Sequence, residues 1–128
     1  MNYSANFSGA LDKAAGLASR TGGLVCTEHL LYGLAAQGGC NAQRILASVR
    51  VTADEVLQLF RLGDQVSRVT MSTRANRAIN NSTALARQTG AAQVNTEHLH
   101  FAVLYDRESV AAQELEKRWG VDDGDMSS

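Results

Sequence analysis

The sequence predicts an all-α fold built from two similar helical halves. Proline is absent from the 128 residues, and apolar residues recur at helical spacing, as at Phe7, Ala10, Leu11 and Ala14. The tetrapeptide Thr-Glu-His-Leu also occurs twice, at 27–30 and 96–99. Because 45% of the residues are hydrophobic, a chain of this length can bury one core. We therefore expect a single domain, residues 1–128, made of two halves.

Helix start and stop signals predict seven helices. Residues that favour the N-cap position precede the apolar runs at Ser8, Thr27, Thr52, Ser72 and Thr96. Glycines occur where helices would end, at Gly22, Gly38, Gly63, Gly90 and Gly120. The expected helices span 9–21, 28–37, 41–49, 53–62, 73–89, 97–105 and 109–119, with short loops between them.

Comparison of the chain with itself indicates a tandem repeat. Leu17 and Gly22 align with Leu85 and Gly90 at one constant offset, and the two Thr-Glu-His-Leu segments align at an offset one residue larger. The repeating unit is about 65 to 70 residues long, which favours a bundle with pseudo-two-fold symmetry. We expect a first repeat at 3–62, a linker at 63–71, a second repeat at 72–121 and a flexible tail at 122–128. The expected core residues are Leu11, Leu17, Leu30, Leu34, Leu46, Ile79, Leu85, Leu99, Val103 and Leu115.

Composition excludes several classes of function. A net charge of −1 and a pI near 6.3 argue against general nucleic-acid binding, which needs clustered basic residues. The sequence has neither a signal peptide nor an apolar run long enough to cross a membrane, so we expect a cytoplasmic protein, or a stromal one in a plastid. Cys26 and Cys40 lack metal-ligand spacing, which indicates small buried side chains with no disulfide and no metal.

The repeated Thr-Glu-His has a structural interpretation. Thr27 and Thr96 would cap helices, and Glu28 and Glu97 would meet the positive end of the helix dipole, each effect being worth about 0.3 to 1 kcal/mol. The histidine that follows is expected to pack against a neighbouring helix. The sequence contains no HExxH, GxSxG or phosphate-binding loop. We therefore expect no enzyme activity, no catalytic residue and no cofactor.

A family resemblance rests on a set of motifs. Phe7-Ser8 and "TEHLLYGLAAQGGCNAQRIL", repeated as "MSTRANRAI", "TEHLHFAVL" and "VAAQEL", resemble the double Clp N-terminal domain of ClpC- and ClpA-type AAA+ unfoldases. The resemblance covers nearly the whole chain. It implies an all-α pseudo-repeat that precedes two ATPase modules, recruits substrates or adaptor proteins, and has no catalytic activity of its own.

The resemblance also implies a binding site for phosphorylated arginine in each half. Residue by residue, it points to Glu28 with Ser8 and to Glu97 with Ser72, beside Thr27 and Thr96. A carboxylate can hold a guanidinium in charge-assisted hydrogen bonds, while N–H groups at a helix N-terminus bind the phosphoryl oxygens. Arg74, in the turn after Ser72, is expected to add positive charge and to make the second half the better site.

Three functions remain open from the sequence. The leading hypothesis is a module that docks adaptors or damaged clients for an AAA+ unfoldase acting with a Clp protease. The alternative is a stand-alone regulatory or structural subunit of a Clp protease complex. Such a subunit would not recognise client proteins. A helical repressor is the third, with 73–88 as its recognition helix carrying Arg74, Arg77 and Arg87, although such a helix is more often a solvated surface.

Overall fold

The computed structural model describes residues 2–120, which form seven α-helices and four two-residue strands. The helices are α1 (Ala5–Ala18), α2 (Thr27–Ala36), α3 (Asn41–Ser48), α4 (Ala53–Leu57), α5 (Thr73–Gln88), α6 (Thr96–Tyr105) and α7 (Val110–Trp119). The strands are β1 (Asn2–Tyr3), β2 (Leu24–Val25), β3 (Thr70–Met71) and β4 (Gln93–Val94). The all-α prediction is confirmed, and the expected tail at 122–128 lies outside the described residues. Within 2–120, none of the helices combines the length and the apolar character that crossing a membrane requires.

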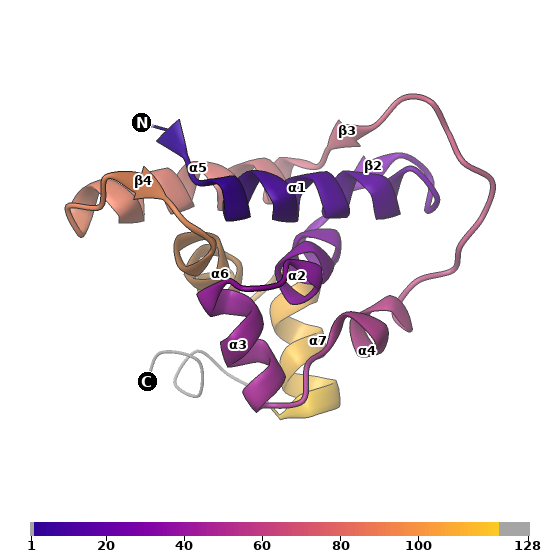
Figure 1. Ribbon diagram of the computed structural model, residues 1–128. Coiled ribbons are helices and arrows are strands. Elements are labelled where there is room, and N and C mark those ends of the chain that lie inside the picture. The colour runs from indigo at the N-terminus through magenta and orange to yellow at the C-terminus, as the bar shows by residue number, and fades with distance from the viewer. Residues whose placement is uncertain (1, 121–128) are drawn as a thin grey trace.

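The helices form two halves with matching parts. Helices α1 and α5 lie along one side of the molecule, α2 and α6 lie beneath them, and α3 and α7 extend from the opposite side (Figure 1). Helix α1 packs on α2 as α5 packs on α6, and α2 also contacts α6 across the halves. Helix α4 packs against α2 and has no counterpart among the described residues of the second half.

The strands join the halves crosswise. Strand β1 pairs in parallel with β4, and β2 pairs in parallel with β3. Two more backbone bonds extend these pairs, because Ser4 N–H donates to Val94 O and Ser72 N–H donates to Val25 O, both at 2.9 Å. The sequence did not predict these strands, since two residues are too few to show an alternating pattern. The pairing places the start of α1 beside the start of α6 and the start of α5 beside the start of α2.

A shared core lies between the layers of helices. Its largest fully buried side chains come from both halves and include Phe7, Leu30, Leu34, Leu99 and Leu115, each worth about 1.5 to 3 kcal/mol when buried. Of the ten core residues that the sequence predicts, seven are buried. The other three, Leu11, Ile79 and Leu85, are only half-buried and pack at the edge of the core.

The two helices of the first half cross at a glycine. A Cβ atom placed on Gly33 of α2 would lie 2.1 Å from Ala10 O and 3.4 Å from the Cβ of Ala14, both in α1. No side chain fits at the first of these distances. Gly33 therefore sets how closely α1 and α2 approach each other.

Three of the five expected N-cap residues are not caps in the structure. The cap of α1 is Ser4, whose Oγ accepts a hydrogen bond from Phe7 N–H at 3.1 Å. The prediction of Ser8 as this cap is wrong, because Ser8 is an exposed residue inside the helix. Thr27 and Thr96 are likewise the first helical residues rather than caps. The caps at Thr52 and Ser72 are confirmed.

Candidate binding sites at the helix N-termini

The two Thr-Glu-His segments build the same local structure. In α2 the Nδ1 atom of His29 accepts the backbone N–H of Cys26 at 2.9 Å, and in α6 the Nδ1 atom of His98 accepts that of Asn95 at 2.9 Å. Each ring thus bonds the N–H of the residue that caps its helix, as the Glu or Gln of a capping box does. The sequence pattern alone does not reveal this role of the ring. The bond explains why a histidine follows both Thr-Glu pairs.

His29 is held from both sides. Its Nε2 atom lies 2.7 Å from Thr21 Oγ1. Because Nδ1 accepts a hydrogen bond, Nε2 carries the proton and donates to the threonine. Burial lowers the pKa of His29 to about 4, so the ring is neutral near pH 7.

The surroundings of His29 bear on metal binding. Ligand atoms of Cys26, Glu28 and His29 lie within 4.8 Å of one another. Both ring nitrogens of His29 are engaged in hydrogen bonds, and a metal would have to displace one of them. We assign no metal to this cluster.

A polar cavity lies beside Glu97. Its volume is about 200 Å³, and its lining includes Ser4, Cys40 and Asn95, the N-caps of α1, α3 and α6. The first N–H groups of a helix have no partner within the helix, and the helix dipole makes that end attractive to anions. The carboxylate of Glu97, half-buried on the same wall, can bind a cation. The cavity thus offers contacts for both charges of a zwitterionic group.

A related arrangement surrounds Glu28. Cys26, at the N-cap position of α2, lies beside Ser72, which caps α5, because Ser72 N–H donates to the carbonyl oxygen of the preceding residue, Val25. Helix α7 begins here too, because Ala111 N–H donates to Thr27 Oγ1 at 3.3 Å. The N-termini of α2, α5 and α7 therefore meet near Glu28 as those of α6, α1 and α3 meet near Glu97.

Glu28 lies in an environment that disfavours its charge. Burial, together with the negative charge of Glu114 on α7, raises the pKa of Glu28 above its ordinary value. Its Oε1 atom is buried without a hydrogen-bond partner among the described residues. A buried carboxylate oxygen with no donor is costly, so this position favours a ligand that supplies N–H groups.

The structure corrects the pairing that the resemblance implies. Ser8 was matched with Glu28, and Ser72 with Glu97. Instead, Ser4 shares a cavity with Glu97, and Ser72 lies at the α2 N-terminus, where its N–H donates to Val25 O. Each glutamate therefore meets the first helix of the other half, and both sites are formed jointly by the two halves.

The expected role of Arg74 is also corrected. One guanidinium nitrogen lies 2.6 and 2.7 Å from the two carboxylate oxygens of Asp106, and another lies 3.8 Å from Glu108. Its charge is thus already balanced by two acids. Arg74 also belongs to α5, which contributes to the Glu28 site. It gives no reason to prefer the Glu97 site and is a poor candidate for contacting DNA.

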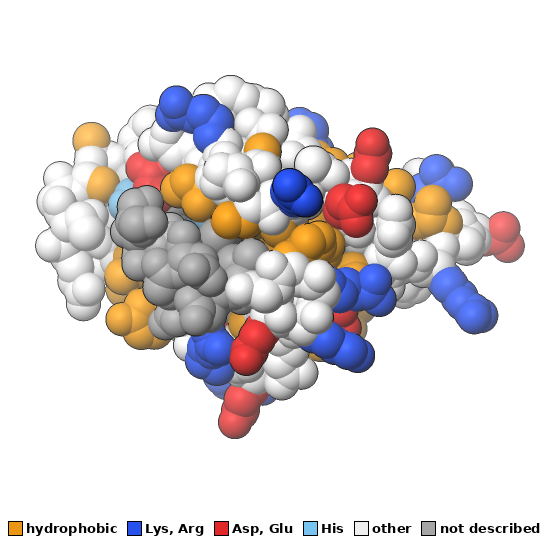
Figure 2. Space-filling model, turned by 90° about the horizontal axis from the view of Figure 1, so that it is seen from below, with side chains coloured by type: hydrophobic (Ala, Val, Ile, Leu, Met, Phe, Trp, Pro, Cys, Tyr) orange, Lys and Arg blue, Asp and Glu red, His pale blue; other side chains and the backbone are white. Residues whose placement is uncertain are grey.

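Charged side chains are mixed on the face seen from below α3 and α7. Figure 2 shows basic and acidic groups interspersed there, with apolar side chains exposed between them. This face does not present the continuous basic surface that phosphate-backbone binding requires.

The chain is similar to known proteins in both sequence and structure. The sequence model of the Clp repeat (R) N-terminal domain matches residues 2–117. None of the curated proteins compared with the chain matches its sequence. The N-terminal domain of Hsp104 from Candida albicans has a similar structure, with a TM-score of 0.78 and 15% identity over 98% of this chain and 87% of that one.

Two further solved structures are similar. The N-terminal domain of the chaperone ClpD from Arabidopsis thaliana has a TM-score of 0.73 and 19% identity over 94% of this chain and 89% of that one. The ClpV N-domain, solved in complex with a VipB peptide, has a TM-score of 0.70 and 20% identity over 92% of this chain and 79% of that one. At these identities the likeness demonstrates a shared fold.

Proposed function

Because the chain belongs to the Clp repeat N-terminal domain family, we propose that it is a non-catalytic module that recruits client or adaptor proteins for a Clp-type AAA+ unfoldase. Membership of the family supports this function. The ClpV N-domain, which shares the fold, is known in complex with a VipB peptide. By analogy this chain binds segments of other proteins and leaves ATP hydrolysis to separate ATPase modules.

We further propose that its two glutamate sites bind phosphoarginine side chains of clients. One observation carries this proposal: three helix N-termini and the carboxylate of Glu97 border the same polar cavity. The guanidinium group would bind Glu97, and the phosphoryl oxygens would bind N–H groups at the starts of α1 and α3. A plain arginine would leave those N–H groups unused, whereas a phosphate ion would leave the carboxylate unused and be repelled by it.

The Glu28 site supports the same chemistry for a different reason. The buried Oε1 atom of Glu28 lacks a donor, and a guanidinium would supply one. The ligand would also offset the burial and the repulsion from Glu114 that raise the pKa of Glu28. Ligand binding at this site should therefore lower that pKa.

Calorimetric titration of phosphoarginine tests the proposal. Removing one charge by Glu97→Gln or Glu28→Gln should weaken binding at the altered site by roughly 1.5 to 3 kcal/mol. The control is Glu55→Gln, because Glu55 is also an acidic residue in a first helical turn, at the start of α4, but is exposed and lines neither site. Its effect on binding should be negligible. If wild type does not bind phosphoarginine at millimolar concentration, phosphoarginine recognition is wrong and only the wider role in protein binding remains.

A further inference from the structure

The polar cavity beside Glu97 adjoins an open groove along α3. The groove has a volume of about 440 Å³ and is bordered by Glu97 and by four residues of α3, namely Asn41, Arg44, Ile45 and Ser48. Asn41 and Glu97 line the cavity as well as the groove. The two hollows therefore share a wall, and Glu97 lies where they meet.

The cavity and the groove differ in what they can hold. The cavity, about 200 Å³ in volume, is smaller than the roughly 300 to 1,000 Å³ of pockets that enclose drug-sized ligands. It can hold the charged end of a phosphoarginine side chain but not the client residues on either side. The groove follows α3 from Asn41 to Ser48, a distance of about 10 Å at the helical rise of about 1.5 Å per residue. Because an extended chain covers that distance in about three residues, the groove suits the residues next to the phosphoarginine.

Arg44 is the charged side chain that such a neighbouring residue meets. It is exposed, and within residues 2–120 its guanidinium bonds to the side-chain oxygen of Asn41 and has no acidic partner. The groove's other α3 residues carry no charge. In the proposed complex the guanidinium of the ligand balances Glu97, and the helix N-termini bind the phosphoryl group. The unbalanced charge of Arg44 therefore favours an acidic side chain on the client.

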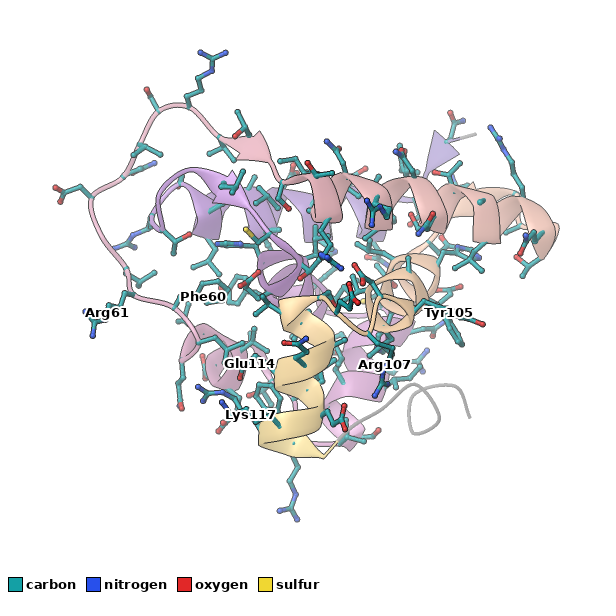
Figure 3. All side chains as sticks on the ribbon, turned by 180° about the vertical axis from the view of Figure 1, so that it is seen from behind. Phe60, Arg61, Tyr105, Arg107, Glu114 and Lys117 are labelled. Carbon is teal, nitrogen blue, oxygen red and sulfur yellow. The ribbon has the colours of Figure 1, made fainter. Side chains whose placement is uncertain are left out.

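The Glu28 site has different charges at the equivalent positions. At the offset of 69 residues that relates the two Thr-Glu-His segments, Arg44 corresponds to Gln113, and the residue after it is Glu114. Figure 3 shows Glu114 on α7. Glu114 helps to raise the pKa of Glu28, and it does so although it is paired with Arg118 at 2.6 Å. The Glu28 site thus lacks the cation and has an acid beside it.

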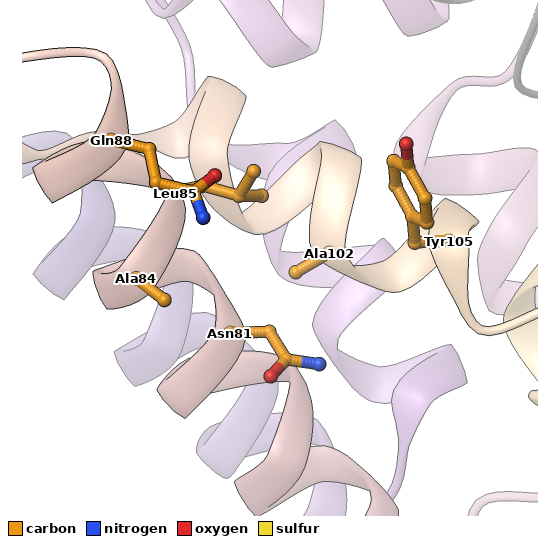
Figure 4. A pocket seen from close by; sticks show the side chains of 6 residues that line it. All are labelled: Asn81, Ala84, Leu85, Gln88, Ala102 and Tyr105. Carbon is orange, nitrogen blue, oxygen red and sulfur yellow. The ribbon is translucent and has the colours of Figure 1, made fainter.

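A further groove, between α5 and α6, offers no charge for such selection. It is lined by Asn81, Ala84, Leu85, Gln88, Ala102 and Tyr105 (Figure 4). None of these six side chains is charged near pH 7, and none of them lines the Glu97 cavity. The charge beside a phosphoarginine bound at Glu97 therefore comes from the groove along α3.

We propose that Arg44 gives the Glu97 site a preference for phosphoarginine residues that have an acidic neighbour in the client sequence. The phosphoarginine side chain occupies the cavity, the adjacent residue lies along α3, and its carboxylate pairs with Arg44. The Glu28 site, with Gln113 and Glu114 at the equivalent positions, does not share this preference. The inference rests on the proposed recognition of phosphoarginine and deepens it by naming the class of client segment that the Glu97 site selects.

Blocked tripeptides test the inference, each with phosphoarginine in the middle and with glutamate, glutamine or lysine on both sides. They are titrated at low salt into the isotopically labelled protein, and the NMR shifts of the Ala42 and Glu97 amides give the affinity of the Glu97 site alone. We expect the glutamate peptide to bind roughly two- to fivefold more tightly than the glutamine peptide, as an exposed ion pair allows, and the lysine peptide to bind most weakly. Arg44→Glu should reverse this order. The matched control is Arg61→Glu, which should keep it, because Arg61 is also exposed and lies on the loop after α4, on the side of the molecule away from Tyr105 of α6 (Figure 3).

Phosphoarginine blocked at both its amino and carboxyl groups separates the possible outcomes. Arg44→Gln should leave its affinity unchanged, because this ligand has no neighbouring residue. If Arg44→Gln weakens it as much as it weakens the glutamate peptide, Arg44 contacts the phosphoryl group and the inference is overturned. Equal affinities of the Glu97 site for the three peptides, or the same order in wild type and Arg44→Glu, would overturn the inference and leave phosphoarginine recognition intact. No binding of the blocked phosphoarginine by wild type at millimolar concentration would overturn both proposals.

Discussion

Replacing Gly33 by alanine should separate α1 from α2. The added Cβ would lie 2.1 Å from Ala10 O and 3.0 Å from the carbonyl carbon of the same residue. Unbonded carbon and oxygen atoms need more than about 3 Å, so the helices would have to move apart by roughly 1 Å. Because both partners are helix backbone, the clash cannot be relieved by rotating a side chain.

The magnitude follows from two opposed effects. Overpacking a core costs about 1 to 3 kcal/mol and sometimes more, whereas removing glycine from a helix gains about 0.5 to 1 kcal/mol. Because the clash is with backbone at 2.1 Å, we expect an overpacking cost at the upper end, about 3 kcal/mol, and a net loss of about 2 kcal/mol in the free energy of unfolding for Gly33→Ala. Gly16→Ala is the control, because a Cβ at Gly16 meets no atom within 4 Å; this variant should gain about 0.5 to 1 kcal/mol.

Urea denaturation of both variants measures the difference. The two changes have the same chemistry and both lie in helices, so only the contact between α1 and α2 separates them. We expect their free energies of unfolding to differ by roughly 3 kcal/mol. Equal stability of the two variants would refute the close crossing of α1 and α2.

Three further predictions concern caps and histidines. Ser4→Ala should cost about 1 kcal/mol of stability through the lost cap, whereas Ser8→Ala should change stability by less than about 0.5 kcal/mol. His100→Leu should stabilise the protein by about 1 to 2 kcal/mol at pH 7, because the Nε2 atom of His100 is buried without a partner among the described residues and the equivalent position in α2 is the buried Leu31. Burial lowers the pKa of His100 to about 4. The folded protein therefore binds fewer protons at His100 than the unfolded chain does between about pH 4 and 6.5. This difference leaves stability unchanged above pH 6.5 and lowers it as the pH falls towards 4. The stability of wild type should therefore decline more steeply over this interval than that of His100→Leu.

Chemical denaturation at several pH values tests all three predictions. Equal losses for the Ser4 and Ser8 variants would contradict the observed start of α1. Destabilisation by His100→Leu at pH 7 would mean that the imidazole makes a contact that the structure lacks. Parallel pH profiles for wild type and His100→Leu would show that His100 does not titrate in this range.

The fold was largely predictable because each helix has its own signals. Apolar spacing and glycine positions identified all seven helices, with most boundaries within a few residues of those observed. The prediction for 53–62 was too long, since α4 ends at Leu57. The following apolar residues, Leu59 and Phe60, pack against the core from an irregular segment, which helical spacing alone does not reveal.

The site was less predictable because it depends on contacts between the halves. Ser4 and Ser8 both precede apolar residues of α1, and the local pattern does not distinguish them. The repeat itself held the missing signal, since the offset of 68 between the first helices places Ser4 opposite Ser72. The crosswise pairing of β1 with β4 is a tertiary contact. The sequence pattern within one half therefore could not have matched Ser4 with Glu97.

We propose that the two halves jointly form each phosphoarginine site. An NMR titration of the isotopically labelled protein with phosphoarginine tests it most directly, because every backbone amide reports separately. We predict concerted shifts of Asn6 and Phe7 at the start of α1, Ala42 at the start of α3, and Glu97 and His98 at the start of α6. Shifts confined to one half, or no shifts at millimolar ligand, would contradict the claim.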